Sequence, residues 1–137
     1  MTADIPAIGA IHHVSITVAD LDRSIDWYRW VLGFEVTARR QTDGADKAML
    51  THSGGLSISL ISHGPRAQPE KFSEFRPGLD HLAFEVADLD ELERWRSILD
   101  DAAIEHNGIV AGMIGHLIAF RDPDGIALEF YTRRPAT

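Results

Sequence analysis

Hydrophobic and polar residues alternate along residues 11–18, a pattern typical of a half-buried strand. After this run, Asp20 is expected to cap the N-terminus of a helix, and Gly33 is expected to end that helix. Three shorter strand-like runs follow at about 34–40, 46–52 and 56–62. The apolar residues of the helix recur at helical spacing on one stripe, which consists of Leu21, Ile25, Tyr28 and Leu32.

The same order of elements occurs a second time. Asp88 and Glu91 resemble a capping box at the start of a second helix. Strands are predicted after it at about 104–111, 115–121 and 126–132, with Asp-Pro-Asp-Gly at 122–125 as the turn between the last two. The apolar stripe of this helix consists of Leu89, Leu92, Trp95 and Leu99.

The two halves also match in sequence. HVSITVADLD at 13–22 corresponds to HLAFEVADLD at 81–90, and SGGLSISL at 53–60 corresponds to PDGIALEF at 123–130. We therefore expect an α+β fold of two tandem βαβββ modules, at about 8–62 and 78–132, within one domain over 1–137. The proline-containing segment 63–78 joins the modules, either as a plain linker or as a flap over a site. Trp27 and Trp95 are equivalent by the duplication, which favours a structural role.

The composition of the chain excludes several classes of partner and of functional site. The 13 basic and 21 acidic residues give a formal charge of −8, so nucleic acid is not an expected partner. The absence of cysteine excludes disulfides and thiolate sites, and no apolar run in the sequence is long enough to span a membrane. We expect a cytoplasmic protein with a small organic substrate. We also expect a homodimer, because half-barrel edges are best covered by a second chain.

The duplication points to a metal site. His13 and His81 open equivalent strands and can face each other across a shared cleft, with the ligands supplied either by one chain or by two. Glu129 lies in an otherwise apolar strand, where a carboxylate needs a cation. Its equivalent in the first module is Ser59. Each residue alone is weak evidence, but two symmetric histidines beside a carboxylate are a stronger indication. His12 is expected on the opposite face, and His52, His63 and His106 are interpreted as surface residues.

HHVSITVADLDRSIDWYRWVLGFEV, LDHLAFEVADLDELERW and FRDPDGIALEFY resemble the vicinal oxygen chelate superfamily. That superfamily includes glyoxalase I, bleomycin-binding proteins, fosfomycin resistance proteins, methylmalonyl-CoA epimerase and extradiol dioxygenases. The resemblance implies metal ligands at His13, His81 and Glu129. The fourth ligand position of the family is Ser59 here, which argues against glyoxalase I and less strongly against the epimerase.

Two histidines and one carboxylate suit Fe(II) or Mn(II), with Zn(II) or Ni(II) as alternatives. The resemblance implies a metal-dependent enzyme in which vicinal oxygens of a small molecule chelate the metal, with lyase, isomerase or dioxygenase chemistry. The alternative is a metal-free protein that binds a drug, as in bleomycin resistance. The reaction type is not encoded in these motifs.

Strand pairing suggests further cleft residues. If Arg121 pairs with Ile126, then Ile118 lies opposite Glu129 and His116 opposite Tyr131, all facing the cleft. His116 is then the candidate for proton transfer and Tyr131 for a hydrogen bond to substrate. In this register no group of lysines or arginines faces the cleft, which disfavours a phosphonate substrate. The rest of the cleft wall would come from Asp46, Ala48, Leu50, Ser57 and Ile61.

Overall fold

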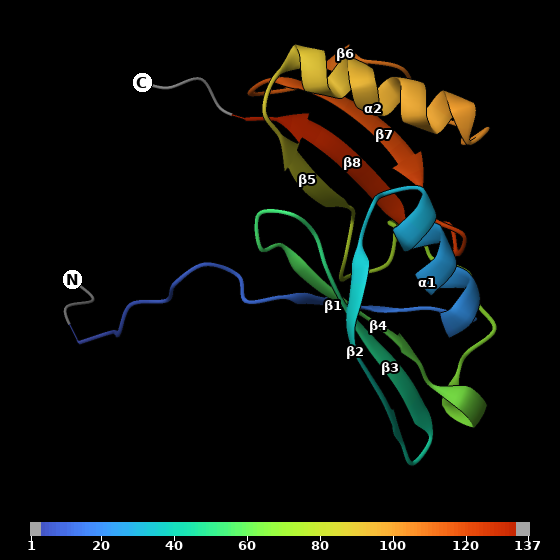
Figure 1. Ribbon diagram of the computed structural model, residues 1–137. Helices are drawn as coiled ribbons and strands as arrows, with labels where there is room; N and C mark the ends of the chain where they lie inside the picture. Colours follow the sequence, from blue (N-terminus) through green and yellow to red (C-terminus); the bar gives the residue numbers. More distant parts are fainter. Residues whose placement is uncertain (1–3, 134–137) are drawn as a thin grey trace.

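The computed structural model describes residues 4–133 as two four-stranded sheets, each with one helix against one face (Figure 1). Each module is a βαβββ unit, as the sequence predicts. The first contains β1 (Val14–Thr17), α1 (Leu21–Trp30), β2 (Glu35–Thr42), β3 (Ala45–Thr51) and β4 (Ser57–Ser62), followed by a 3-10 turn at Gly64–Arg66. The second contains β5 (Leu82–Val86), α2 (Leu89–Asp101), β6 (Val110–Ala111), β7 (His116–Arg121) and β8 (Ala127–Thr132).

The strand order is the same in both sheets. The first runs β1-β4-β3-β2 and the second β5-β8-β7-β6, with the outer pairs β1/β4 and β5/β8 parallel. One predicted strand is much shorter than expected, since only Val110–Ala111 of 104–111 pairs regularly with β7. Ahead of it, the Asn107 side-chain oxygen accepts the Ala119 N–H at 2.8 Å, which replaces a regular ladder bond. Ala103 and Gly108 have positive φ, which interrupts the extended backbone.

Aspartate side chains begin both helices. Asp20 Oδ1 accepts a hydrogen bond from Arg23 N at 3.0 Å, and Asp88 Oδ1 accepts one from Glu91 N at 3.0 Å. The apolar stripe of α1 is buried as predicted. In α2, Leu92 and Leu99 are buried and Trp95 packs against them, but Leu89 is exposed.

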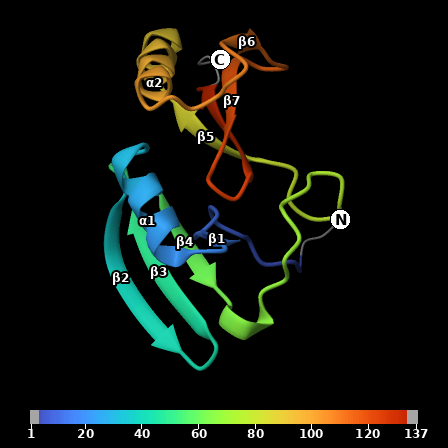
Figure 2. The same cartoon turned by 90° about the vertical axis from the view of Figure 1, so that its right-hand side faces the viewer.

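One continuous hydrophobic core joins the modules. Trp27 of α1 lies against Phe120 of β7, with ring centroids 6.3 Å apart, and Phe34 lies 6.0 Å from Phe84 of β5. These residues lie on the helix side of each module, so the shared core lies on that side of both sheets. Helix α1 lies beside the turn between β7 and β8 of the second module (Figures 1 and 2). The opposite face of each sheet, here called the cleft face, points away from that shared core. The symmetric tryptophans Trp27 and Trp95 both pack on the core, which supports a structural role.

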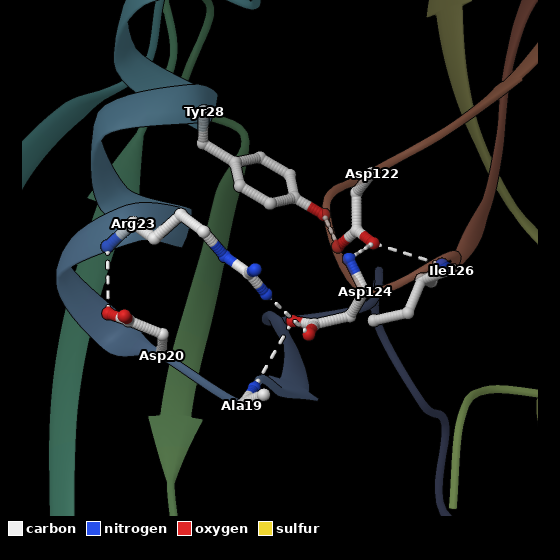
Figure 3. A network of polar contacts seen from close by, with 7 residues as sticks. All are labelled: Ala19, Asp20, Arg23, Tyr28, Asp122, Asp124 and Ile126. Atoms are coloured by element: carbon white, nitrogen blue, oxygen red, sulfur yellow. Dashed lines mark hydrogen bonds and ion pairs between the residues drawn. The ribbon is translucent and has the colours of Figure 1, made fainter.

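A polar network fastens α1 to the β7–β8 turn (Figure 3). Tyr28 Oη donates to Asp122 Oδ2 at 2.9 Å, and the other oxygen of Asp122 accepts the N–H groups of Asp124 and Ile126. Asp124 in turn pairs with Arg23 at 3.0 Å and accepts the Ala19 N–H. The turn is thereby held against the first module.

The register across this turn differs from the predicted one. Asp122 N donates to Ile126 O at 3.1 Å, so these two residues close the hairpin around a three-residue loop. Gly125 takes the left-handed φ of 79° that such a loop requires. Arg121 therefore pairs with Ala127 and Ala119 with Glu129, while Ile118 pairs with Phe130 inside the core. The prediction that Ile118 faces the cleft was wrong by one residue, which reverses the face of every side chain on β7.

Within residues 4–133, none of the helices has the length and apolar character needed to cross a membrane.

A candidate metal centre in two halves

The second module brings two of the predicted ligands together on its cleft face. His81 Nε2 lies 3.5 Å from Glu129 Oε1. Asp80 Oδ1 accepts the other ring nitrogen of His81, Nδ1, at 2.7 Å. A carboxylate on Nδ1 fixes the ring and leaves Nε2 as the ligand atom, which is the arrangement that metal-binding histidines favour. The Glu129 side chain is only 17% exposed, and a cation beside it would offset the burial of its charge.

A pocket of about 340 Å³ adjoins Glu129. Sequence reasoning treated His106 as a surface residue, yet its side chain is 13% exposed and lines this pocket with Asn107. Its Nε2 is held by Asp100 Oδ1 at 2.6 Å. Arg121, whose face was misassigned together with that of β7, also lines the pocket. The irregular course of residues 104–108 brings His106 there, a feature for which the sequence gives no clear periodic signal.

The first module holds the third predicted ligand in an equivalent place. His13 lies on a pocket of about 230 Å³ together with Ser15 and Ser59. Its Nδ1 is 2.8 Å from Nδ1 of His12, so one of the two rings donates to the other. His12 was expected on the opposite face, but β1 begins only at Val14 and strict alternation does not apply to it. His12 thus occupies the position that corresponds to Asp80, beside an equivalent histidine.

Ser59 and Glu129 are equivalent in three dimensions. Ser15 pairs with Ser59 across β1 and β4, as Ala83 pairs with Glu129 across β5 and β8. The Ser59 hydroxyl is buried and hydrogen bonded to the Ser15 hydroxyl. A neutral hydroxyl that is already paired is a poor ligand for a divalent metal.

The three predicted ligands do not converge within one chain. Among residues 4–133, no group of three or more histidines and acidic residues is arranged to hold a metal ion. Within one chain, His13 and His81 do not face each other across a shared cleft, because the modules share their core and each cleft face points elsewhere. The predicted ligands therefore lie in two separate places, here called half-sites, with His81 and Glu129 in one and His13 in the other.

Of the two residues predicted to assist catalysis, one lies on the opposite face of the sheet. His116 alternates with Ile118 and Phe120 on β7, whose side chains are buried in the core, so it is directed to the helix side and not to the cleft face. Tyr131 does share the cleft face with Glu129. Its hydroxyl, however, accepts the Ile114 N–H at 3.2 Å in the turn before β7.

The predicted cleft wall of the first module is correct for two of its five residues. Ser57 and Ile61 share the face of Ser59, as expected. Asp46, Ala48 and Leu50 alternate onto the other face, where Ala48 and Leu50 are buried in the core. The cleft face of β3 carries Lys47, Met49 and Thr51 instead. Lys47 and Arg40 both line the pocket of His13, which corrects the prediction that no basic pair faces the cleft.

The connecting segment 63–78 is tied to the second cleft face. Glu74 forms an ion pair with Arg121 at 2.9 Å, and this hydrogen-bonded pairing lowers the pKa of Glu74 and raises that of Arg121. Phe72 of the same segment packs against the core. Part of the segment therefore lies beside the pocket of Glu129 and Arg121, as a flap would.

Comparison with known proteins gives a consistent family. The family model described as the Glyoxalase/Bleomycin resistance protein/Dioxygenase superfamily matches residues 10–130. The crystal structure of a glyoxylase/bleomycin resistance protein/dioxygenase domain from Frankia sp. EAN1pec is 37% identical, with a TM-score of 0.87 over 93% of this chain and 100% of that one.

Several curated relatives carry the names of enzymes. Catechol-2,3-dioxygenase of Bacillus subtilis is 33% identical over 91% of this chain and 42% of its own length. The 2-epi-5-epi-valiolone epimerase of an Actinomyces species is 28% identical over 91% of this chain and 80% of its own length. The chain spans about two fifths of the length of the ring-cleaving dioxygenase relatives that it matches.

Proposed function

The chain belongs to the Glyoxalase/Bleomycin resistance protein/Dioxygenase superfamily, and we propose that it is a divalent-metal-dependent enzyme acting on a small oxygenated molecule. The observation that carries the proposal is the pair His81 and Glu129, 3.5 Å apart, with Asp80 holding the far side of the His81 ring. Histidine nitrogen and carboxylate oxygen in this arrangement fit Fe(II) or Mn(II), with Zn(II) or Ni(II) as alternatives.

We further propose that a second copy of the chain completes the centre. In a two-fold homodimer, the half-site with His81 and Glu129 would receive His13 from the partner's first module. Exposed apolar residues support such a contact, since Ile8 and Ile11, just before His13, and Met113 are 95%, 82% and 100% exposed. The edge strand β2 is also exposed along its whole length.

The metal, when bound, would act as a Lewis acid toward vicinal oxygens of the substrate. Other residues of the chain would orient the ligands and shape the space for substrate. Asp80 would orient the His81 ring, and Ser59, at the fourth ligand position of the family, would leave room for substrate at the position equivalent to Glu129. His106 lines the pocket of Glu129, but both of its ring nitrogens are engaged, Nε2 with Asp100 and Nδ1 with the Gly108 N–H, so it would shape the pocket and not move a proton. Lyase, isomerase and dioxygenase chemistry all remain compatible with this set of side chains.

Metal analysis of the purified protein tests the proposal. We expect about one equivalent of metal per chain, and His81→Ala should remove most of it because that variant lacks a ligand. His116→Ala is the matched control, since His116 lies on the opposite face of the sheet, and it should keep the wild-type content. Full retention of metal in His81→Ala would reject the assigned ligands.

A metal-free binding protein of the bleomycin-resistance type is the second candidate. The separation of His13 from His81 and Glu129 within one chain is the observation in its favour. This candidate predicts that the dimer binds a small organic ligand equally well after exhaustive chelation. The enzyme proposal predicts instead that chelation abolishes turnover in a screen of diols, catechols and 2-oxo aldehydes, and that Fe(II), Mn(II), Zn(II) or Ni(II) restores it.

A further inference from the structure

A β-bulge in β2 determines which of two consecutive arginines, Arg39 or Arg40, lies on the cleft face. The pairing of β2 with β3 shifts between Val36 and Ala38, so that Thr37 is the extra residue. Beyond this point Arg39 lies opposite Ala48 and Arg40 lies opposite Lys47. Without the bulge, Arg39 would take the cleft face and Arg40 the helix side. Bulges of this kind redirect side chains and are frequent beside functional sites.

The two arginines lie on opposite faces of the sheet, as consecutive strand residues do, and have different surroundings. Arg39, on the helix side, pairs with Asp22 of α1 at 2.7 Å and with Asp46 at 3.1 Å. Arg40 and Lys47, on the cleft face, take part in none of the ion pairs found among residues 4–133. Two like charges directly opposite each other on neighbouring strands repel. An anion between them would remove that repulsion.

The duplicated module provides an internal comparison. Lys47 pairs with Ile61 on β4 and with Arg40 on β2, whereas the equivalent Leu117 pairs with Tyr131 on β8 and with Val110 on β6. The fold therefore accepts apolar residues at these two positions. The cationic pair in the first module is not needed to build the sheet, so a function of its own explains it better.

Arg40 and Lys47 lie where they could contact a ligand bound beside His13. Both line the pocket of His13, Ser15 and Ser59, one pleat along the sheet from Ser59. Hydroxyl and imidazole groups in the same pocket can hydrogen bond to oxygens. In a chain with a net charge of −8, two unneutralised cations in one hollow form a local positive field that attracts anions.

We propose that Arg40 and Lys47 form an anion subsite that binds a carboxylate or phosphoryl group of the substrate. The inference rests on the proposed function, because it places that group beside the metal centre, with the vicinal oxygens toward His13 and the anionic group toward β2 and β3. The substrate class is thereby narrowed from any small diol or oxo compound to one that carries a negative charge.

Binding of simple anions to metal-free protein tests the subsite directly. Methylphosphonate and acetate, with neutral acetamide as the uncharged reference, are titrated at low ionic strength while the arginine and backbone N–H resonances of β2 and β3 are followed by NMR. The wild type should bind at least one of the two anions and not acetamide. The preferred anion distinguishes a phosphoryl substrate from a carboxylate one.

Matched variants distinguish binding at this site from a nonspecific effect of the total charge of the protein. Arg40→Gln and Lys47→Gln should each weaken binding of the preferred anion by about tenfold, the effect expected of one charge-assisted hydrogen bond. Arg39→Gln removes the same charge one residue away and should change affinity less than about twofold. The pair Arg40→Lys and Lys47→Arg preserves the charges and should retain binding, which controls for misfolding.

Equal weakening by Arg39→Gln and Arg40→Gln, or no binding of either anion by the wild type, would overturn the subsite. The outcome is independent of the metal proposal. His81→Ala should bind the anion as the wild type does, and Arg40→Gln should keep its metal. If His81→Ala retained metal while Arg40→Gln lost the anion, the metal ligands would be wrong and the anion subsite would stand.

Discussion

The Tyr28 hydroxyl donates a hydrogen bond to the Asp122 carboxylate at 2.9 Å, and both residues are buried. Tyr28 lies on α1 of the first module and Asp122 in the β7–β8 turn of the second (Figure 3). This bond therefore joins the modules across their shared core. Burial beside a carboxylate raises the pKa of Tyr28 far above its usual value, so the hydroxyl stays protonated and keeps donating.

Tyr28→Phe should lower the free energy of unfolding by about 1–3 kcal/mol, because it leaves a buried carboxylate with one fewer donor. Urea denaturation measures the change. Tyr131→Phe is the matched control, since its hydroxyl meets only an exposed turn N–H in the structure, and it should cost less than about 0.5 kcal/mol. Equal effects of the two substitutions would show that the bond to Asp122 is not an important link between the modules.

Asp122 should make stability depend on pH. Burial is the largest influence on its pKa and raises it above the ordinary range, although hydrogen bonds from Tyr28 and from backbone N–H groups act in the other direction. The folded protein then holds this proton more tightly than the unfolded chain, where an aspartate titrates near about 3.9. The stabilisation is complete below that pH and is lost as pH rises through the folded pKa.

Comparison with Asp122→Asn, which cannot titrate, isolates this contribution. The free energy of unfolding of the wild type minus that of the variant should fall as the pH is raised from about 4 to 7. A difference that stays constant or grows over this range would contradict the raised pKa.

The repeating order of elements was predictable because duplication, capping aspartates and apolar stripes are local signals. The register of β7 was not, because it depended on one residue in the turn. Asp-Pro-Asp-Gly was interpreted as a four-residue loop, whereas Asp122 and Ile126 pair and leave three. The glycine at the third loop position, suited to positive φ, was the available signal. That single slip placed His116 and Ile118 on the wrong face.

Whether the two half-sites come together within one chain could also not be predicted from the sequence. Equivalence of His13 and His81 follows from the duplication, but whether two modules share a cleft or a core depends on long-range packing. In this protein the modules share a core, because Trp27 packs against Phe120 and Phe34 packs against Phe84. Arg40 was missed for a related reason, since no sequence signal marks the extra residue at Thr37 that turns it to the cleft face.

Ser59→Glu should tighten metal binding, because it adds a charged oxygen at the position equivalent to Glu129. If substrate uses the position that Ser59 leaves open, turnover should fall while metal affinity rises. Metal titration and activity measure the two effects separately. Ser62→Glu adds the same charge to the other face of β4 and should change neither. Unchanged metal affinity in Ser59→Glu would show that this side chain does not reach the metal.

The most direct test of a centre shared between two chains is metal content in mixed dimers. His13→Ala and Glu129→Ala each damage every site of their own homodimers, so both should lose most of their metal. When equal amounts are unfolded together and refolded, random pairing makes about half of the dimers mixed, and each mixed dimer has one intact site built from undamaged halves of both chains. We predict recovery of about a quarter of the wild-type metal per chain. No recovery above the two parent variants, in a mixture shown by mass spectrometry to contain mixed dimers, would contradict a metal centre built from two chains.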